Sequence, residues 1–395
     1  MNRRLFLQLL ASSFALPYAS RLYATPATDS RFLLVFLRGG YDAANILVPH
    51  SSSFYYEARP TLAIAKPDVT NEKAALALNS DWGLHPALKD SMGELFARKQ
   101  LAFIPFAGSD DVSRSHFETQ DSIALGQPLI GHKDYNSGFM NRLVSVLSNS
   151  RSVSFTDNLP LIFNGTNEIA NFSLKTKDKA VISPHQAEIL AQMYSQHHLD
   201  SEVKKGLALS REVTQAFEQE MQQANRGAIL ASGFEIEARR VAQMMQDKFN
   251  IGFIDVGGWD THINQGAAEG SLANKMKQLG HGLSTFATEM GNAWAKTVVL
   301  VISEFGRTFR ENGNHGTDHG HGSVYWLLGG GVQGGKIVGE QVAITENNLF
   351  QNRDYPVLND YRAVIGGLLR TQFGLSAADL QKVFAGVSPV DLKLL

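Results

Sequence analysis

The stretch GTDHGHGS, residues 316–323, is the part of this sequence densest in side chains that bind metals or transfer protons. His319 and His321 are two residues apart, so in an extended chain both imidazoles leave the backbone on the same side. Asp318 points the other way in such a chain and could support a histidine from behind. The flanking glycines let the backbone approach a ligand closely. The stretch is either part of a metal site or a glycine loop whose histidines face solvent.

Two other segments carry side chains of the same kind. The segment GGWDTHINQ places Asp260 two residues before His262, and imidazole with carboxylate suits Zn²⁺, Mn²⁺ or Fe. The segment EFGRTFR offers Glu304 as a metal ligand and Arg307 as a fork of donors for an anionic oxygen. The alternatives are an Asp–His pair in a polar loop and a surface Glu–Arg pair, which contributes little stability.

Two earlier segments could add a carboxylate and a nucleophile. In RGGYDAAN, Asp42 follows two glycines and could reach a metal, or could cap a helix. In AGSDDVSRSHFETQD, Ser113 or Ser115 could start a helix near His116, and Glu118 completes a capping box with Ser115. The same geometry directs a hydroxyl toward the positive end of a helix, where anions bind. Such a serine would suit nucleophilic attack in phosphoryl transfer.

Short apolar runs separated by helical patterns must position these side chains. The predicted strands are FLLVFL (32–37), LAFIPF (101–106), LPLIF (159–163), IGFIDV (251–256), TVVLVIS (297–303) and SVYWLLGG (323–330). Helices are predicted at 85–99 and 272–296, and a segment of about 185–250 reads as a helical insertion or cap. We therefore predict an α/β fold, a three-layer sandwich with a mostly parallel central sheet. Ligands of such sheets bind at the carboxyl ends of the strands, where the candidate residues would converge.

Composition excludes several classes of function. The chain has no Cys, so disulfides, thiolate ligands and a Cys nucleophile are excluded. Lys plus Arg (36) nearly balances Asp plus Glu (38), which gives no basic surface for nucleic acid. Residues 1–24 start with Arg3 and Arg4 and continue with an apolar run, which is typical of a twin-arginine export signal. We expect export through the twin-arginine translocase to a periplasm, a single domain at 25–395, and no stable membrane span in the mature form; an uncleaved anchor is the alternative.

The order of these motifs resembles the alkaline phosphatase-like superfamily of phosphatases, sulfatases and phosphodiesterases. More closely, FLRGGYDAANILVPH, SRSHFETQD, GGWDTHINQ, ISEFGRTFRENGNHGTDHGHGSV and LLGGGVQGGKIVG look like the exported bacterial domain-of-unknown-function family 1501, over about residues 30–375. The resemblance implies that Asp42 matches the Asp after the first strand. It implies a nucleophile at Ser113 or Ser115, an Asp and His cluster at Asp260 and His262, and a late His at His319 or His321.

The chain departs from the superfamily at one informative position. Where the superfamily has an Asp-His pair, this chain has Glu304 followed by Phe305, so one imidazole ligand is replaced. The setting of a sulfatase formylglycine nucleophile is also absent from the sequence. His116, His315 or the second histidine of the HGH segment could supply the replacement ligand.

The sequence therefore predicts a metal-dependent hydrolase of phosphate or related esters, acting on a small anionic ester. The predicted ligands of one or two divalent ions (Zn, Mn or Ca) are Asp42, Asp260, His262, Glu304, His319 and His321. In this prediction Ser113, Ser115 or a water attacks, and Arg307 stabilises the developing charge. The alternative is an inactive exported protein that keeps the fold and binds or assembles with an unknown exported partner. A further alternative is that these loops only cap a structural core.

Overall fold

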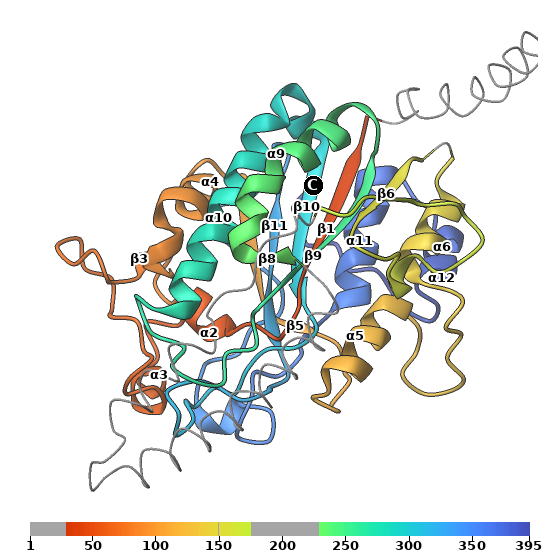
Figure 1. Ribbon diagram of the computed structural model, residues 1–395. Helices are drawn as coiled ribbons and strands as arrows, with labels where there is room; N and C mark the ends of the chain where they lie inside the picture. Colours follow the sequence, from red (N-terminus) through yellow and green to blue (C-terminus); the bar gives the residue numbers. More distant parts are fainter. Residues whose placement is uncertain (1–28, 149, 175–228) are drawn as a thin grey trace, which may run out of the picture.

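The computed structural model describes residues 29–148, 150–174 and 229–395 (Figure 1). Within these residues, ten strands form one sheet in the order β12-β5-β11-β10-β1-β9-β6-β7, with β13 beside β5 and β8 beside β9. The strands are β1 (Arg31–Leu37), β5 (Leu101–Gly108), β6 (Ser152–Phe155), β7 (Ala170–Asn171), β8 (Ile229–Leu230), β9 (Ile251–Gly257), β10 (Thr297–Ser303), β11 (Ser323–Leu328), β12 (Lys336–Ile337) and β13 (Asn359–Asp360). A smaller sheet has the order β2-β4-β3, from β2 (Leu47–Val48), β3 (Leu76–Ala77) and β4 (Gly83–Leu84).

Strand β1 lies in the centre of the large sheet and pairs in parallel with β9 and β10. Its residues are buried on both faces, as expected for a continuous apolar run in a covered parallel sheet. Leu33, Val35 and Leu37 face one apolar core, and the alternate residues of the strand face the other core. The three-layer α/β prediction is thus confirmed.

Helices cover both faces of the sheet (Figure 1). On one face, α9 packs along α10, which buries Leu272, Met276, Leu279 and Leu283 at helical spacing. The helices of this face are α4 (Glu94–Ala97), α9 (Ala231–Asp247) and α10 (Ser271–Glu289). The helices of the other face are α5 (His116–Leu125), α6 (Phe139–Val146), α11 (Tyr361–Phe373) and α12 (Ala377–Val383). Two short helices, α2 (Ala43–Ile46) and α3 (Ser53–Ala58), follow β1.

Strand β11 is antiparallel to both of its neighbours, β10 and β5. Ser323 at its start therefore pairs with Ala107 near the end of β5, not with the beginning of that strand. The loop that precedes β11 lies at the same edge of the sheet as the loops that follow β1, β5, β9 and β10. Only this strand direction lets GTDHGHGS join the other candidate segments.

Most of the predicted elements are confirmed, and two need correction. LPLIF is not a strand, because Pro160 lacks an N–H and the next residues form a short 3-10 turn, η3 (Leu161–Phe163). The strand of this region is β6, whose SVSF sequence alternates serine with apolar residues and which lies between β9 and the short edge strand β7. The predicted helix at 85–99 is divided into η1 (Pro86–Leu88), a π-turn η2 (Lys89–Gly93) and α4.

The terminal and inserted segments are only partly described. The predicted export signal at 1–24 lies outside the described residues, and so does the part of the predicted insertion at 185–228. The end of that insertion is α9, which packs on α10 and belongs to one covering layer of the sheet. No helix in the described part of the chain has the length and apolarity needed to cross a membrane.

Candidate metal centre

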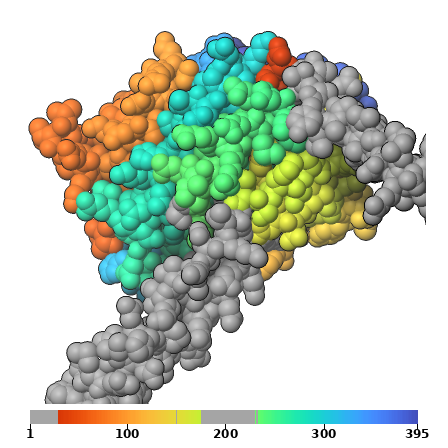
Figure 2. All heavy atoms as spheres, turned by 45° about the horizontal axis from the view of Figure 1, so that its top comes forward, coloured from red at the N-terminus to blue at the C-terminus, as the bar shows by residue number. Residues whose placement is uncertain are grey.

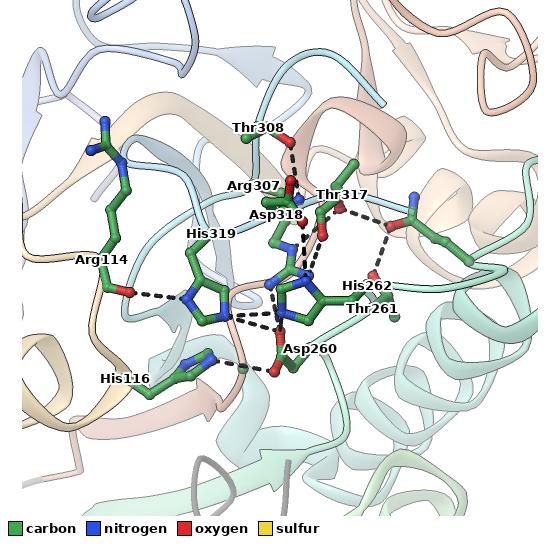
Figure 3. Close-up of polar contacts among 12 residues, drawn as sticks. Arg114, His116, Asp260, Thr261, His262, Arg307, Thr308, Thr317, Asp318 and His319 are labelled. Atoms are coloured by element: carbon green, nitrogen blue, oxygen red, sulfur yellow. Dashed lines mark hydrogen bonds and ion pairs between the residues drawn. The ribbon is translucent and has the colours of Figure 1, made fainter. Parts of the chain in front are cut away.

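Four loops at one edge of the sheet bring the candidate residues together (Figure 3). His116 is the first residue of α5, and Asp260 with His262 lies in the loop after β9. His319 comes from the loop before β11, and Glu304 directly follows β10. His116, Asp260 and His319 each offer a ligand atom within 4.8 Å of the others. The predicted convergence of distant segments at the carboxyl edge is therefore observed for this group.

The carboxylate of Asp260 is the centre of the cluster (Figure 3). Its Oδ1 accepts a hydrogen bond from Arg307 Nη1 at 2.6 Å and lies 2.9 Å from His262 Nε2 and 3.3 Å from His319 Nε2. Its Oδ2 lies 3.4 Å from His116 Nε2. Only 1% of the side chain is exposed, so these contacts replace water around a buried charge. Asp260 therefore joins three imidazoles and one guanidinium.

His116 is held from behind by a second carboxylate. Its Nδ1 donates to Glu304 Oε1 at 2.8 Å, which leaves Nε2 directed at Asp260. Glu304 Oε1 also accepts from the backbone N–H of Gly39 and from Gln120 Nε2, each at 2.8 Å. A carboxylate behind a histidine sets the ring orientation in many metal centres. Glu304 is thus an orienting group for His116, and its three donors keep it in place.

The orientation of His319 is set by a backbone carbonyl. His319 Nδ1 lies 3.0 Å from the carbonyl oxygen of Arg114, and since a carbonyl only accepts, Nδ1 carries the proton. Nε2, the other ring nitrogen, faces Asp260 and His262. Arg114 has a φ of 53°, a left-handed conformation that is uncommon outside glycine. Its side chain binds Asp354 at 2.7 Å, which helps to hold this strained backbone in place.

His262 completes the group on its more open side. Its Nε2 lies 3.1 Å from His319 Nε2, and its Nδ1 lies 3.3 Å from Asp318 Oδ1. Asp318 is half exposed and also accepts from Asn312 Nδ2. The predicted supporting role of Asp318 is consistent with this contact. Opposite, the ring of Phe305 packs 4.9 Å from the His116 ring and 5.1 Å from the His319 ring, which gives the cluster one apolar wall.

The donor set fits a divalent transition metal. Ligands about 2.0–2.1 Å from a tetrahedral Zn²⁺ lie roughly 3.3 Å from one another. The contacts around Asp260 span 2.9 to 3.4 Å. His116 Nε2 and Asp260 Oδ2 are both buried and make no hydrogen bond within the described structure. Two facing buried atoms of this kind are costly unless a proton or a cation lies between them.

The close contacts among His116, Asp260 and Glu304 shift the pKa values of all three side chains. Burial lowers the pKa of His116, but the nearby carboxylates of Asp260 and Glu304 outweigh burial and raise it to about 9. Burial raises the pKa of Glu304, but its hydrogen bond to His116 outweighs that effect and lowers the pKa to about 2. The pKa of Asp260 is lowered despite burial, because the histidines bind the charged form. These shifts correspond to a protonated His116 between the ionised carboxylates of Asp260 and Glu304.

The family described as Protein of unknown function (DUF1501) matches residues 29–384. The chain belongs to this family. The resemblance drawn from the motifs is thus confirmed, and the match includes every residue of the cluster. A comparison with curated proteins found no match.

Solved structures of several proteins are similar to this DUF1501 chain. One is a protein in the alkaline phosphatase superfamily from Vibrio parahaemolyticus, with 11% identity, a TM-score of 0.42, and coverage of 89% of this chain and 69% of that one. Another is the lipoteichoic acid synthase LtaP from Listeria monocytogenes, with 7% identity, a TM-score of 0.43, and coverage of 94% and 79%. A third is Ps i-CgsB in complex with k-i-k-neocarrahexaose, with 8% identity, a TM-score of 0.40, and coverage of 93% and 75%.

Four of the six predicted ligands of this DUF1501 protein lie outside the group formed by His116, Asp260 and His319: Asp42, His262, Glu304 and His321. Asp42 Oδ2 forms a buried ion pair with Arg59 Nη1 at 2.5 Å and accepts from Gln265 Nε2 at 2.6 Å. Asp42 precedes α2, but its side chain makes no capping hydrogen bond, so the capping alternative is also wrong. The ring of His321 packs on Phe350 with the centroids 4.6 Å apart. The bound arginine and the packed ring explain why neither Asp42 nor His321 joins the cluster.

The structure also shows the surroundings of three further predicted site residues, Glu304, Arg307 and Ser115. Glu304 is not an exposed partner of Arg307, and it supports His116 instead of facing the cluster itself. Arg307 directs its guanidinium at Asp260 and at the carbonyl and hydroxyl of Thr317, so it orients the Asp260 carboxylate, and its role toward a substrate anion stays a prediction. Ser115 Oγ caps α5 by accepting from the N–H of Glu118.

The two serines keep their nucleophilic role only as a prediction. Ser113 Oγ is 3.3 Å from Thr119 Oγ1, and it also accepts from the N–H of Ser115. Both hydroxyls therefore organise the start of α5, and among the described contacts neither reaches Asp260. One half of the predicted capping box is present, because the N–H of Glu118 donates to Ser115 Oγ, whereas the N–H of Ser115 donates to Ser113 Oγ and not to Glu118.

Sequence reasoning named His116 only as one of several replacement ligands and did not find Gln120 or Gln265. Gln120 lies four residues after His116 on α5, so both side chains are on one face of the helix and reach Glu304 together. The four-residue spacing of His116 and Gln120 could therefore have indicated that the two side chains share a partner. Gln265 donates a hydrogen bond to Asp42 and accepts one from Thr261. No spacing in the sequence indicates the contact between Gln265 and Asp42.

Proposed function

We propose that this chain is an exported, metal-dependent hydrolase of phosphate or related esters. In this proposal His116, Asp260 and His319 hold the ion, and His262 completes the site. The observation that carries it is the pair of buried atoms, His116 Nε2 and Asp260 Oδ2, that face each other at 3.4 Å without a hydrogen bond. Two or three imidazoles with one carboxylate favour Zn²⁺ or Mn²⁺ over Ca²⁺, which prefers oxygen ligands.

The residues around the cluster have separable tasks. A divalent ion would supply Lewis acidity toward an ester oxygen. Glu304 fixes the His116 ring, the Arg114 carbonyl fixes the His319 ring, and Arg307 keeps Asp260 ionised and oriented. Phe305 excludes water from one side of both rings.

His262 and Asp318 suit proton transfer at the open side of the site. The carboxylate of Asp318 is half exposed and lies 3.3 Å from His262 Nδ1, so a proton can pass from this ring to solvent. Export through the twin-arginine route to a periplasm belongs to the proposal and rests on the pattern of residues 1–24.

The test is to purify the full chain without chelators and measure bound metals by mass spectrometry. Hydrolysis of p-nitrophenyl phosphate, bis-p-nitrophenyl phosphate and p-nitrophenyl sulfate is then assayed with Zn²⁺, Mn²⁺ or Ca²⁺ added. We expect one of the ions to copurify, and both metal and activity to be lost in Asp260→Ala and in His319→Ala. His321→Ala is the matched control and should keep both.

Two results would overturn the proposal. A folded protein that binds none of these ions would remove the metal centre. A metal-loaded protein without turnover on all three esters would favour the alternative of an exported binding or assembly protein. The presence of Phe305 where the superfamily has a histidine is the feature of the chain that fits this alternative.

A further inference from the structure

A second site lies beside the metal cluster, on the face of the sheet that α5 covers. It is a cavity of about 230 Å³ between α5, the loop after β6, and the carboxyl ends of β1 and β9. Its polar lining includes Arg38, Asp255, Gln120, Thr156, Asp157 and Asn158. The volume exceeds that of a single water site many times, so the cavity can admit a small organic molecule.

The floor of the cavity is a buried ion pair. Arg38 Nε binds Asp255 Oδ2 at 2.6 Å, with 8% and 5% of the two side chains exposed. Arg38 Nη1 also donates to Gln120 Oε1 at 2.6 Å. A guanidinium has five N–H groups, so these two bonds leave further donors for a ligand. Because burying a charged pair costs desolvation energy, a pair kept at the bottom of a cavity indicates a polar ligand rather than a stabilising role.

The charges of the lining disfavour an ionic ligand. Arg38 contributes one positive charge, and Asp255 and Asp157 contribute two negative charges, so the lining carries a net charge of 1 − 2 = −1. This sum opposes phosphate or sulfate. The one buried carboxylate, Asp255, is already bound to Arg38, which leaves little to attract a cation. Hydroxyl groups both donate and accept, so they match a floor of alternating donors and acceptors.

The walls of the cavity are apolar. Phe36 and Phe253 are buried at the sheet, and Leu159 and Leu161 close the side of the loop after β6. Leu159 is 43% exposed, so this loop is also where the cavity reaches solvent. An apolar wall beside a polar floor suits a ring that has C–H groups on one face and hydroxyls at its edge.

We propose that this cavity binds a small, uncharged, polyhydroxylated molecule such as a monosaccharide. The site is distinct from the metal cluster and does not need a metal. The two are adjacent, because Gln120 contacts Arg38 on one side and Glu304 on the other. A sugar in the cavity would thus lie one hydrogen-bonded side chain away from the group that orients His116.

The test uses the full chain and saturation-transfer NMR with named probes. The sugar probes are methyl β-galactopyranoside, methyl α-glucopyranoside and xylose, and the comparators are inorganic phosphate, putrescine and cyclohexanol. We expect at least one sugar to bind, with the comparators weaker by at least about tenfold. We expect the same sugar affinity after EDTA treatment. This separates the inference from the proposed function, since metal loss would abolish hydrolysis only.

Two variants at one position locate the binding. Ala124 is a partly buried residue of α5 that lines the cavity, so Ala124→Phe fills the space without touching the ion pair. Ala124→Ser is the matched control, because it leaves the volume nearly unchanged. We expect Ala124→Phe to weaken sugar binding at least about tenfold and Ala124→Ser to retain it, both with native circular dichroism. No sugar binding, a preference for phosphate or putrescine, or equal binding by both variants would overturn the proposal.

Discussion

Metal binding to the cluster should depend steeply on pH because His116 holds a proton in the metal-free protein. Burial lowers the pKa of this imidazole, but Asp260 and Glu304 outweigh burial and raise it to about 9. A metal ligand must be deprotonated, so the ion competes with this proton. The raised pKa therefore weakens binding at neutral pH and leaves it unaffected above the pKa.

The size of the effect follows from the pKa. Near pH 7, about two units below the pKa, roughly one molecule in a hundred has a neutral His116. Metal affinity should then rise about tenfold for each pH unit up to about pH 9, with about one proton released per ion, and should level off beyond it. Glu304→Gln removes the negative charge behind His116 while keeping the side-chain shape. In that variant the curve should level off at a lower pH, and the limiting affinity should fall about 10–100-fold.

The assay is competition for Zn²⁺ against a chelator of known affinity across this pH range. Calorimetry in buffers of different ionisation enthalpy counts the protons released. His321→Ala serves as the control, because His321 packs on Phe350 outside the cluster. An affinity that stays constant over the range, or a Glu304→Gln curve identical to that of the unmodified chain, would refute the proposed role of His116.

Two further predictions concern stability and can be measured by urea unfolding. Asp42→Ala leaves the fully buried guanidinium of Arg59 without its carboxylate, and it should cost about 3–5 kcal/mol, whereas Glu94→Ala in the exposed pair with Arg98 should have little effect. A small cost for Asp42→Ala would mean that Arg59 is not held by that charge. Gly306→Ala would place a Cβ 2.0 Å from the carbonyl oxygen of Gly322 and should cost about 1–3 kcal/mol, whereas Gly313→Ala meets nothing within 4 Å and should be neutral. Equal stability of the two glycine variants would contradict the close approach of the loops.

Local patterns predicted the central strands well because their burial is complete. The run TVVLVIS corresponds residue for residue to β10, and FLLVFL to nearly all of β1. The sequence does not predict β6, which lies between β9 and β7, because its serines interrupt the apolar run that marks a fully covered strand. The helix predicted at 85–99 was broken into short turns, which reflects packing against α10 that no local pattern contains.

The residues of the candidate site could also be predicted from the sequence only in part. Residue types and their position after a strand point to Asp260 and His262, because a parallel sheet gathers its strand ends at one edge. His319 is singled out by its residue type, and it precedes β11 instead of following a strand. The same reasoning could not separate Asp42 from them. Asp42 is separated from the cluster because it forms an ion pair with Arg59. No sequence motif around Arg59 indicates that Asp42 is its partner.

The sequence by itself determined the class of fold, the family and the edge of the sheet where the candidate polar side chains gather. The fold class follows from hydrophobic periodicity, the edge of the sheet follows from the order of polar loops along the chain, and the family follows from the resemblance of its motifs. The tertiary structure alone decided that β11 runs antiparallel, which brings His319 to that edge. The tertiary structure also decided that Glu304 binds the Nδ1 atom of His116, and that Asp42 forms an ion pair with Arg59. These outcomes depend on contacts between residues far apart in the chain, whose distances and charges no local pattern encodes.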